Sequence, residues 1–311
     1  MWTLSGFTDE MSPELEGSER PQIFQGVNMP KIGVQMMMLK NKVEQSGPYE
    51  VLRRLDTIGF KAVEVSQISM TSQNVAEMRR AKDELGIDFG ALSAGLEAGP
   101  NDSLIDDYAK IVDDARTLGA SRLRIGMMPF AAMASHEALL EFCRQAEKIS
   151  TRLAEDGITL YYHNHHLEFA KRDGITILDT IRAEAPTLRL EIDVHWVQRG
   201  GKDPVRTLQK YAGLVDLVHL KDYRIGELPP TAFEALQSGD YAAFMQAFTG
   251  VAQFGEIGEG NLEWTEIIDQ AITSGAEYLL IEQDDQYGRD PFDCLQTSRE
   301  NLVALGFESL F

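Results

Sequence analysis

The residues best suited to chemistry are gathered in one part of the chain. The stretch YYHNHHLEF, from Tyr161 to Phe169, places three imidazoles and one carboxylate within six residues. The chain has six histidines, and five of them lie between His163 and His219. Imidazole and carboxylate groups carry most acid–base catalysis and bind most metal ions in proteins. The chemistry of this region depends on which other polar groups can reach it.

Similar groups stand at the ends of the apolar runs that follow. Glu168 comes after TLYYHNH, Asp193 ends RLEIDV, His219 lies in LVHLKD, and Glu282 lies in YLLIEQ. Three carboxylates and one imidazole that converge with room for water suit Mn²⁺, Mg²⁺ or Co²⁺ better than a tetrahedral structural zinc. A bound ion of this kind could acidify a C–H bond next to a substrate carbonyl.

These groups can meet only if the apolar runs are strands of one parallel sheet. Eight short β-rich runs alternate with segments of helical periodicity after residue 31, and helices end in glycines such as Gly59 and Gly119 just before the next run. The runs are KIGVQMM, AVEVSQ, FGALSA, RLRIGMM, TLYYHNH, RLEIDV, LVHLKD and YLLIEQ. Eight is the number that closes a (β/α)₈ barrel, whose chemistry lies at the carboxyl ends of the strands. A doubly wound sheet would have fewer strands and a glycine-rich turn after the first, which is missing here.

Two segments depart from the repeating pattern. Residues 1–30 are polar and proline-bearing, and we expect them to form an N-terminal arm outside a catalytic barrel of residues 31–311. Residues 224–261 form a long insertion after the seventh strand, with an amphipathic stretch inside it. Because long βα loops of a barrel lie over the active face, we expect this insertion to act as a lid.

The overall composition restricts the partners. A net charge of −20 argues against nucleic acid, which requires a concentrated basic surface, and favours a small uncharged substrate. No signal peptide and no apolar run of membrane-spanning length is visible, so we expect a cytoplasmic protein without membrane insertion. Cys143 and Cys294 are far apart in the sequence, and we expect both to be reduced and buried.

The ordered set of motifs resembles a known family. YHNHHLEF, EIDVHWVQRGGKDP, VHLKDY, GEGNLEW and IEQD, in this order and at strand ends, are similar to motifs of the sugar phosphate isomerase/epimerase superfamily. This superfamily has the xylose isomerase-like barrel and includes ketose 3-epimerases, inosose dehydratases and a DNA-repair endonuclease branch. The resemblance covers about residues 31–305.

The resemblance implies a role for each matching residue. Glu168, Asp193, His219 and Glu282 would hold one divalent ion, with Mn²⁺ preferred over Mg²⁺, Co²⁺ or Zn²⁺, and Glu168 and Glu282 would also transfer the proton. The substrate contacts would be His163, His165, His195, Lys221 and Arg224. One departure is that many ketose epimerases carry the glutamate directly at the end of strand five, whereas Glu168 comes a turn later. His163 or His165 would then be the alternative ligand.

The function predicted in this way is a metal-dependent isomerase or epimerase acting on a ketose, keto-sugar or cyclitol through an enediolate. The alternative on the same site is a dehydratase or lyase of the inosose or 3-keto-glycoside type. Endonuclease activity would need a basic groove and three zinc ions, and the net charge of −20 argues against it. A sugar-binding protein without turnover would not need all four ligands, so their presence argues against that function. A homo-oligomer, dimer or tetramer, is expected because barrels of this kind often pair.

Overall fold

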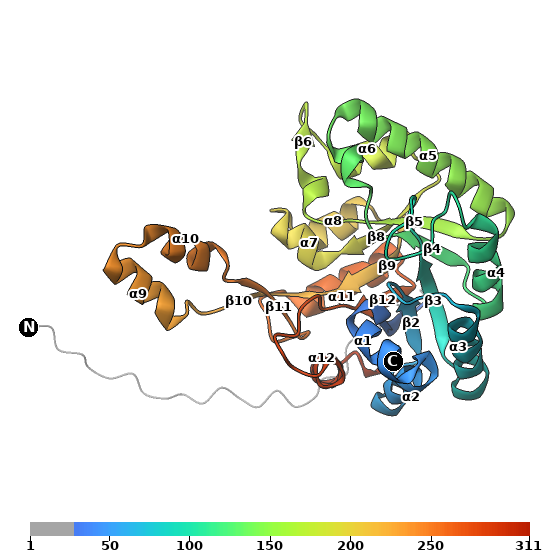
Figure 1. Ribbon diagram of the computed structural model, residues 1–311, viewed down its shortest axis with the longest axis horizontal. Helices are drawn as coiled ribbons and strands as arrows, with labels where there is room; N and C mark the ends of the chain where they lie inside the picture. The colour runs from blue at the N-terminus through green and yellow to red at the C-terminus, as the bar shows by residue number, and fades with distance from the viewer. Residues whose placement is uncertain (1–27) are drawn as a thin grey trace, which may run out of the picture.

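The computed structural model describes residues 28–311, which form a closed barrel of eight parallel strands surrounded by helices (Figure 1). Neighbouring strands follow the order β1-β12-β9-β8-β5-β4-β3-β2. The barrel strands are β1 (Lys31–Gln35), β2 (Ala62–Val65), β3 (Asp88–Ser93), β4 (Arg122–Ile125), β5 (Thr159–His163), β8 (Arg189–Asp193), β9 (Val215–Leu220) and β12 (Tyr278–Ile281). Each coincides with one of the eight predicted runs, so the (β/α)₈ prediction is confirmed. Of the predicted N-terminal arm, residues 1–27 lie outside the described residues.

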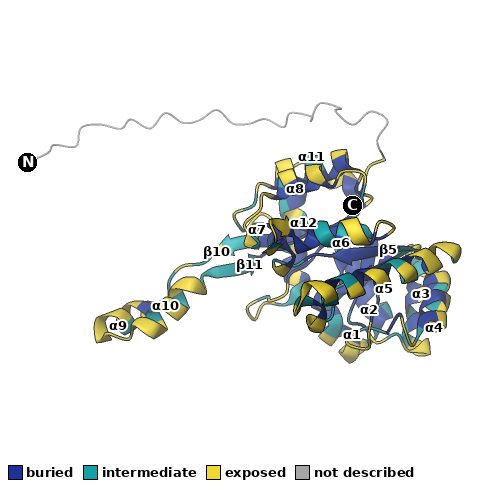
Figure 2. Ribbon diagram, turned by 90° about the horizontal axis from the view of Figure 1, so that it is seen from above, coloured by how far each residue is buried: buried dark blue, intermediate teal, exposed yellow. Residues whose placement is uncertain are grey.

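The helices that follow the strands cover the outside of the barrel. They are α2 (Pro48–Ile58), α3 (Ser72–Leu85), α4 (Tyr108–Leu118), α5 (His136–Glu155), α6 (Ile177–Glu184), α8 (Pro204–Lys210), α11 (Trp264–Ser274) and α12 (Pro291–Ala304). Local signals set their ends: the Thr71 hydroxyl accepts the amide of Asn74 at the start of α3, and Gly59 ends α2 with φ of 107°. Their apolar residues are buried against the strands, and Figure 2 shows buried and exposed residues on the same helices.

Short elements lie between the strands and these helices, and one more, η4 (Glu308–Leu310), follows the last helix. The former are η1 (Met36–Leu39), α1 (Lys40–Ser46), η2 (Phe130–Met133), η3 (Leu167–Phe169), β6 (Lys171–Arg172), β7 (Ile175–Thr176) and α7 (Val194–Arg199). Both cysteines are free and buried, as predicted. Within the described part of the chain, every helix is too short or too polar to cross a lipid bilayer.

The barrel interior changes from apolar to charged along the strands. An apolar cluster comprises Ala62, Ala91, Tyr161, Leu217, Tyr278 and Leu280. Because every second residue of a strand points to the same side, the next inward positions after Ala62, Leu217 and Leu280 are Glu64, His219 and Glu282. These three polar side chains are at most 4% exposed. Strand periodicity therefore places the ionisable groups in one layer above an apolar floor.

The insertion after β9 does not lie over the mouth of its own barrel, so the expected lid is not what the structure shows. Its two ends pair as an antiparallel ribbon of β10 (Asp222–Ile225) and β11 (Ala252–Gly255). The ribbon carries two helices, α9 (Pro230–Ser238) and α10 (Tyr241–Thr249), which extend away from the barrel in both views (Figures 1 and 2). We call residues 226–251 the projection. The ribbon leads away from the barrel rim, and α9 and α10 lie at its far end (Figures 1 and 2).

Candidate active site

Four ionisable side chains meet at the carboxyl ends of four adjacent strands. His163 ends β5, Asp193 ends β8, His219 lies in β9, and Glu282 directly follows β12. One potential ligand atom from each lies within 4.8 Å of the others, and all four side chains are buried. This is the end of a (β/α)₈ barrel where catalytic groups are found, because the βα loops converge there.

The partners of His219 define which of its ring nitrogens faces the group. Its Nδ1 lies 2.8 Å from Glu282 Oε2, and its Nε2 lies 3.3 Å from Glu64 Oε2 and 3.2 Å from Glu191 Oε1. A metal-binding histidine ordinarily donates its other ring N–H to a carboxylate, which fixes the tautomer. With Nε2–H donating to Glu64 or Glu191, the Nδ1 lone pair would be free for a cation.

Two atoms of the group have no well-aligned hydrogen bond although they are buried. His163 Nε2 and Asp193 Oδ2 are 3.4 Å apart, and neither has a hydrogen-bonding partner of good geometry. Their other atoms are held in place: His163 Nδ1 lies 3.2 Å from the Gly126 carbonyl, and Asp193 Oδ1 accepts the Trp196 amide. Buried polar atoms are normally satisfied. The side chains are thus oriented so that His163 Nε2 and Asp193 Oδ2 point into the group, where Asp193 Oδ2 also forms an ion pair with Lys221.

Lys221 and Asp284 border the four-residue group. The Lys221 ammonium lies 3.0 Å from Asp193 Oδ2, 2.7 Å from Glu282 Oε2 and 3.0 Å from Asp284 Oδ1. Burial raises the pKa of Asp284 to about 6, although Lys221 opposes the shift. Burial also opposes ionisation of Asp193 and Glu282, but Lys221 holds the pKa of both carboxyl groups well below the usual range. Both are therefore anionic at neutral pH.

A second buried layer supports His219 from below. The Arg124 guanidinium is paired with Glu64 and lies 3.2 Å from Glu191 Oε2. Burial and the nearby Glu64 carboxylate raise the pKa of Glu191 to about 8, whereas Arg124 and His219 outweigh burial and lower the pKa of Glu64 to about 2. Glu64, Glu191 and His219 could also surround an ion. Arg124 already supplies the positive charge between the two carboxylates, so a metal ion is not needed there.

The charges in the two layers match the requirements of a divalent cation. With Glu191 protonated, four ionised carboxylates remain: Glu64, Asp193, Glu282 and Asp284. They are opposed by two permanent cations, Arg124 and Lys221. Burial opposes a charge on His219, but the surrounding carboxylates raise its pKa well above the usual value. The site therefore attracts positive charge at His219. A divalent ion that replaced the His219 proton would leave the ring neutral and would balance the two surplus negative charges of the carboxylates over Arg124 and Lys221.

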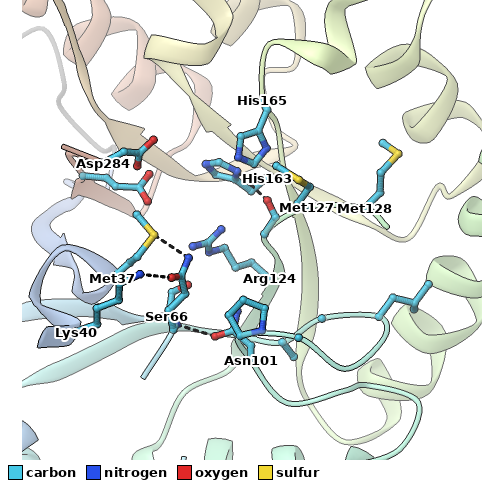
Figure 3. Close-up of a pocket in the computed structure, with 18 of the residues that line it drawn as sticks. Met37, Lys40, Ser66, Asn101, Arg124, Met127, Met128, His163, His165 and Asp284 are labelled. Atoms are coloured by element: carbon cyan, nitrogen blue, oxygen red, sulfur yellow. Dashed lines mark hydrogen bonds between the residues drawn. The ribbon is translucent and has the colours of Figure 1, made fainter. Parts of the chain in front are cut away.

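A cavity of about 790 Å³ opens beside this group. That volume lies within the range of roughly 300–1,000 Å³ of small-molecule sites. His163, Glu282 and Asp284 line it together with Arg124 and residues of the loops after β1, β2, β3 and β4 (Figure 3). In Figure 3, Asp284 lies on the left of the view, and His163 and His165 lie near its centre, above Arg124. A substrate in the cavity would meet His163 and Glu282, the two members of the four-residue group that line it.

The structure does not bring the predicted ligand Glu168 to this group. Its carboxylate accepts the Tyr162 hydroxyl at 2.6 Å and the His165 amide at 2.9 Å, and the residue is fully buried in η3. Burial raises the pKa of Glu168. The turn after β5 closes this local arrangement, and His163 supplies the β5 contribution to the group instead. This corresponds to the alternative based on the YHNHH stretch.

The five predicted substrate contacts separate into two sets. His163, His165 and Lys221 line the cavity. His195 and Arg224 are not among its lining residues: His195 Nδ1 lies 2.8 Å from the Asp222 carbonyl, and the Arg224 guanidinium donates to Gln253. The helical start of α7 turns the side chain of His195 toward the ribbon, where its ring stacks on Phe254.

Several residues of the site were missed by the sequence reasoning. Glu64, Arg124 and Glu191 lie inside the barrel, Gln35 donates to Glu282 Oε1 at 2.8 Å, and Asp284 lines the cavity. A signal for Glu64 was present, because it is the one charged residue within the apolar strand AVEV, whereas Arg124 and Glu191 share their strands with other charged residues. Charged side chains are rarely buried without a partner, so such positions point inward to a paired group.

The fold and the site define a (β/α)₈ protein with a buried cluster of imidazole and carboxylate ligands at the carboxyl end of its barrel. Residues 52–304 match the family described as the xylose isomerase-like TIM barrel. The chain belongs to this family. A comparison with curated proteins finds no match.

Solved structures with the same fold carry several activities. A sugar phosphate isomerase/epimerase from Parabacteroides distasonis superposes with a TM-score of 0.69 at 18% identity, covering 89% of this chain and 99% of that one. The 3-keto-D-glucoside 4-epimerase of E. coli gives 0.60 at 14% identity, covering 88% and 99%. A probable 3-DHS dehydratase from Bacillus anthracis gives 0.63 at 13% identity, covering 88% and 98%. At these identities the likeness shows the fold.

Proposed function

We propose that this protein is a divalent-metal-dependent isomerase or epimerase that acts on a ketose, keto-sugar or cyclitol by removing a proton next to a carbonyl, through an enediolate. The observation that carries the proposal is the group of His163, Asp193, His219 and Glu282 beside the cavity. His163 and Asp193 are held by outer partners so that His163 Nε2 and Asp193 Oδ2 point into the group. Such preorganisation is expected of a catalytic metal site.

The ligand set favours a transition metal. The four proposed ligands offer two imidazole nitrogens and two carboxylates, whereas the set predicted with Glu168 had one imidazole. Nitrogen ligands shift preference away from Mg²⁺ and toward Mn²⁺, Co²⁺ and Zn²⁺. We propose Mn²⁺ as the working ion. When bound, it would stabilise the negative charge that develops on substrate oxygen as the proton leaves.

Proton transfer is proposed to use Glu282 and Asp284 in place of the pair Glu168 and Glu282. Both carboxyl groups line the cavity, whereas Glu168 does not. The pKa of Asp284, raised to about 6, is close to neutral pH, where a group can both accept and return a proton. Burial and neighbouring positive groups lower the pKa of His165 to about 2, so its neutral ring is suited to hydrogen bonding with substrate. Lys221 would neutralise charge on the two carboxylates.

A dehydratase or lyase of the inosose or 3-keto-glycoside type is the second candidate. With a pKa of about 6, a fraction of Asp284 is protonated near neutral pH and could protonate a departing hydroxyl group. The fold is shared with a probable 3-DHS dehydratase, so the barrel is compatible with this chemistry. The two candidates differ in whether the substrate carries a leaving group next to the carbanion.

The test is a solvent deuterium-exchange screen of ketoses, keto-sugars and inososes with added Mn²⁺. We expect label at the carbon next to the carbonyl, and the Glu282→Gln and Asp284→Asn variants should each lose at least about 100-fold of the exchange rate. Glu168→Gln is the matched control and should keep exchange within a few-fold of wild type. Loss of exchange in Glu168→Gln with normal rates in Asp284→Asn would instead assign proton transfer to Glu168 and Glu282. No exchange in any substrate with a fully metal-loaded protein would refute the proton-transfer class.

A further inference from the structure

The projection exposes an apolar surface that the rest of the described chain does not cover. In α10 no residue is buried, and in α9 only Ala232 is. Phe233 is 50% exposed and Tyr241 is 66% exposed, and Leu236, Met245 and Phe248 are exposed as well. Contiguous apolar patches of this kind are rare on monomers and mark interaction sites.

The helices of the projection are too short to be stable by themselves. Each has nine residues, and isolated helices below roughly 12–15 residues are marginal in water. The base is firmly held, because Asp222 in β10 accepts the Gly258 amide at 2.8 Å and the Trp264 indole N–H at 2.7 Å. A rigid base that carries an apolar tip away from its own barrel requires a partner surface elsewhere.

The charge of the projection restricts that partner. Residues 226–251 contain Glu227, Glu234 and Asp240 but no lysine or arginine. Two projections packed against each other would place like charges together without compensation, which is unfavourable. A complementary surface should therefore be apolar and basic.

Such a surface lies at the barrel rim of this same chain. We call it the rim patch, and it comprises Phe130, Leu167, Lys171, Ile175, Arg199 and Lys202. Phe130 is 72% exposed and Ile175 is 56% exposed. The segments that carry these residues are adjacent, because Arg172 donates to the Met133 carbonyl and the Phe169 ring lies against the backbone of Gly200.

We propose that two copies of this chain form a dimer in which the projection of each lies on the rim patch of the other. The apolar side chains of one projection expose on the order of 500 Å², judged from aromatic side chains of ~150–250 Å² that are about half exposed. The dimer would contain two such contacts, and each contact buries surface on the projection and on the rim patch. The total buried surface is then somewhat more than about 1,600 Å², which is the standard size of a specific interface. The reciprocal arrangement is isologous and closes at two copies.

The arrangement has a consequence for the cavity. Phe130 belongs to the rim patch and also lines the cavity. A projection seated there would form part of the cavity wall from the second copy. The insertion would then serve as a cover in the partner, which explains why it points away from its own barrel.

The test measures the mass of the full-length chain by sedimentation velocity and native mass spectrometry. The wild type should have twice the mass of one chain. A projection variant, Phe233→Asp with Phe248→Asp, and a rim variant, Phe130→Asp with Ile175→Asp, should each be monomeric. An equimolar mixture of the two variants should recover a dimer with one copy of each, because one intact projection still meets one intact rim patch. The control Ile105→Asp changes an exposed apolar residue outside both surfaces and should remain dimeric.

Other results would overturn the proposal. A monomeric wild type would mean that the projection has no second copy as its partner. A dimeric rim variant with a monomeric projection variant would mean that projections pack on each other, and failure of the mixture to form a dimer would exclude the reciprocal contact. If a variant's far-UV circular dichroism differs from wild type, the milder pair Phe233→Ser with Phe248→Ser or Phe130→Ser with Ile175→Ser replaces it and must give the same pattern.

Discussion

The assignment of His163 rather than Glu168 as the β5 ligand leads to a direct prediction about metal affinity. His163 Nε2 is buried without a good hydrogen bond and belongs to the four-residue group, whereas both carboxylate oxygens of Glu168 already accept hydrogen bonds. We therefore expect His163→Ala to weaken Mn²⁺ binding strongly. Glu168→Gln should leave it nearly unchanged.

The size of the effect follows from the number of ligands. In structural zinc sites, four protein ligands together contribute about 10–16 kcal/mol, or about 3 kcal/mol for each, and we take the same share per ligand for Mn²⁺. Loss of one ligand then raises the Kd for Mn²⁺ roughly 100- to 200-fold. Glu168→Gln removes an oxygen acceptor from the Tyr162 hydroxyl or the His165 amide, which should cost about 1 kcal/mol of stability and change the Kd by less than about 3-fold.

Isothermal titration calorimetry of chelator-treated protein with Mn²⁺ measures both values. Urea unfolding of each apo variant separates a ligand effect from a folding effect. The reasoning is refuted if Glu168→Gln loses 100-fold or more in affinity while His163→Ala binds as the wild type does. In that case η3 would have to rearrange on metal binding to deliver Glu168.

Two further predictions concern stability. Arg124→Met leaves Glu64 and Glu191 buried without their cation, and it should lower the free energy of unfolding by about 3–5 kcal/mol in urea titrations; a loss below 1 kcal/mol would show that the pairing is dispensable. Burial opposes ionisation of Asp88, but the Lys31 ammonium and the Tyr278 hydroxyl lower its pKa below the usual 3.8. The contribution of Asp88 to the free energy of unfolding is therefore complete above pH 3.8. It disappears as the pH falls through the lower pKa of the folded state. Asp88→Asn should therefore cost about 1 kcal/mol at pH 7 and almost nothing near pH 2, and an equal cost at both pH values would contradict the assignment.

The barrel was predictable because its signals are local. Each strand is a short apolar run, each following segment has helical periodicity, and glycines such as Gly59 and Gly119 end the helices. The ends of the strands also placed Asp193, His219 and Glu282 at one pole, since parallel strands of a barrel present their carboxyl ends together. The projection's direction was not predictable, because a long insertion with amphipathic segments is equally compatible with a cover over its own barrel.

The amino-acid sequence by itself determined the eightfold repeat, the order of the strands along the chain and the pole at which the ionisable groups gather, because these follow from the spacing of apolar residues and from strand periodicity. Only the tertiary structure decided which side chain of the YHNHH stretch faces the group, that Glu64, Arg124 and Glu191 form a buried support beneath His219, and where the projection points. These depend on rotamers, turn geometry and contacts between strands distant in sequence. Pairs such as Glu64 and His219 are separated by 155 positions and meet only when the barrel closes.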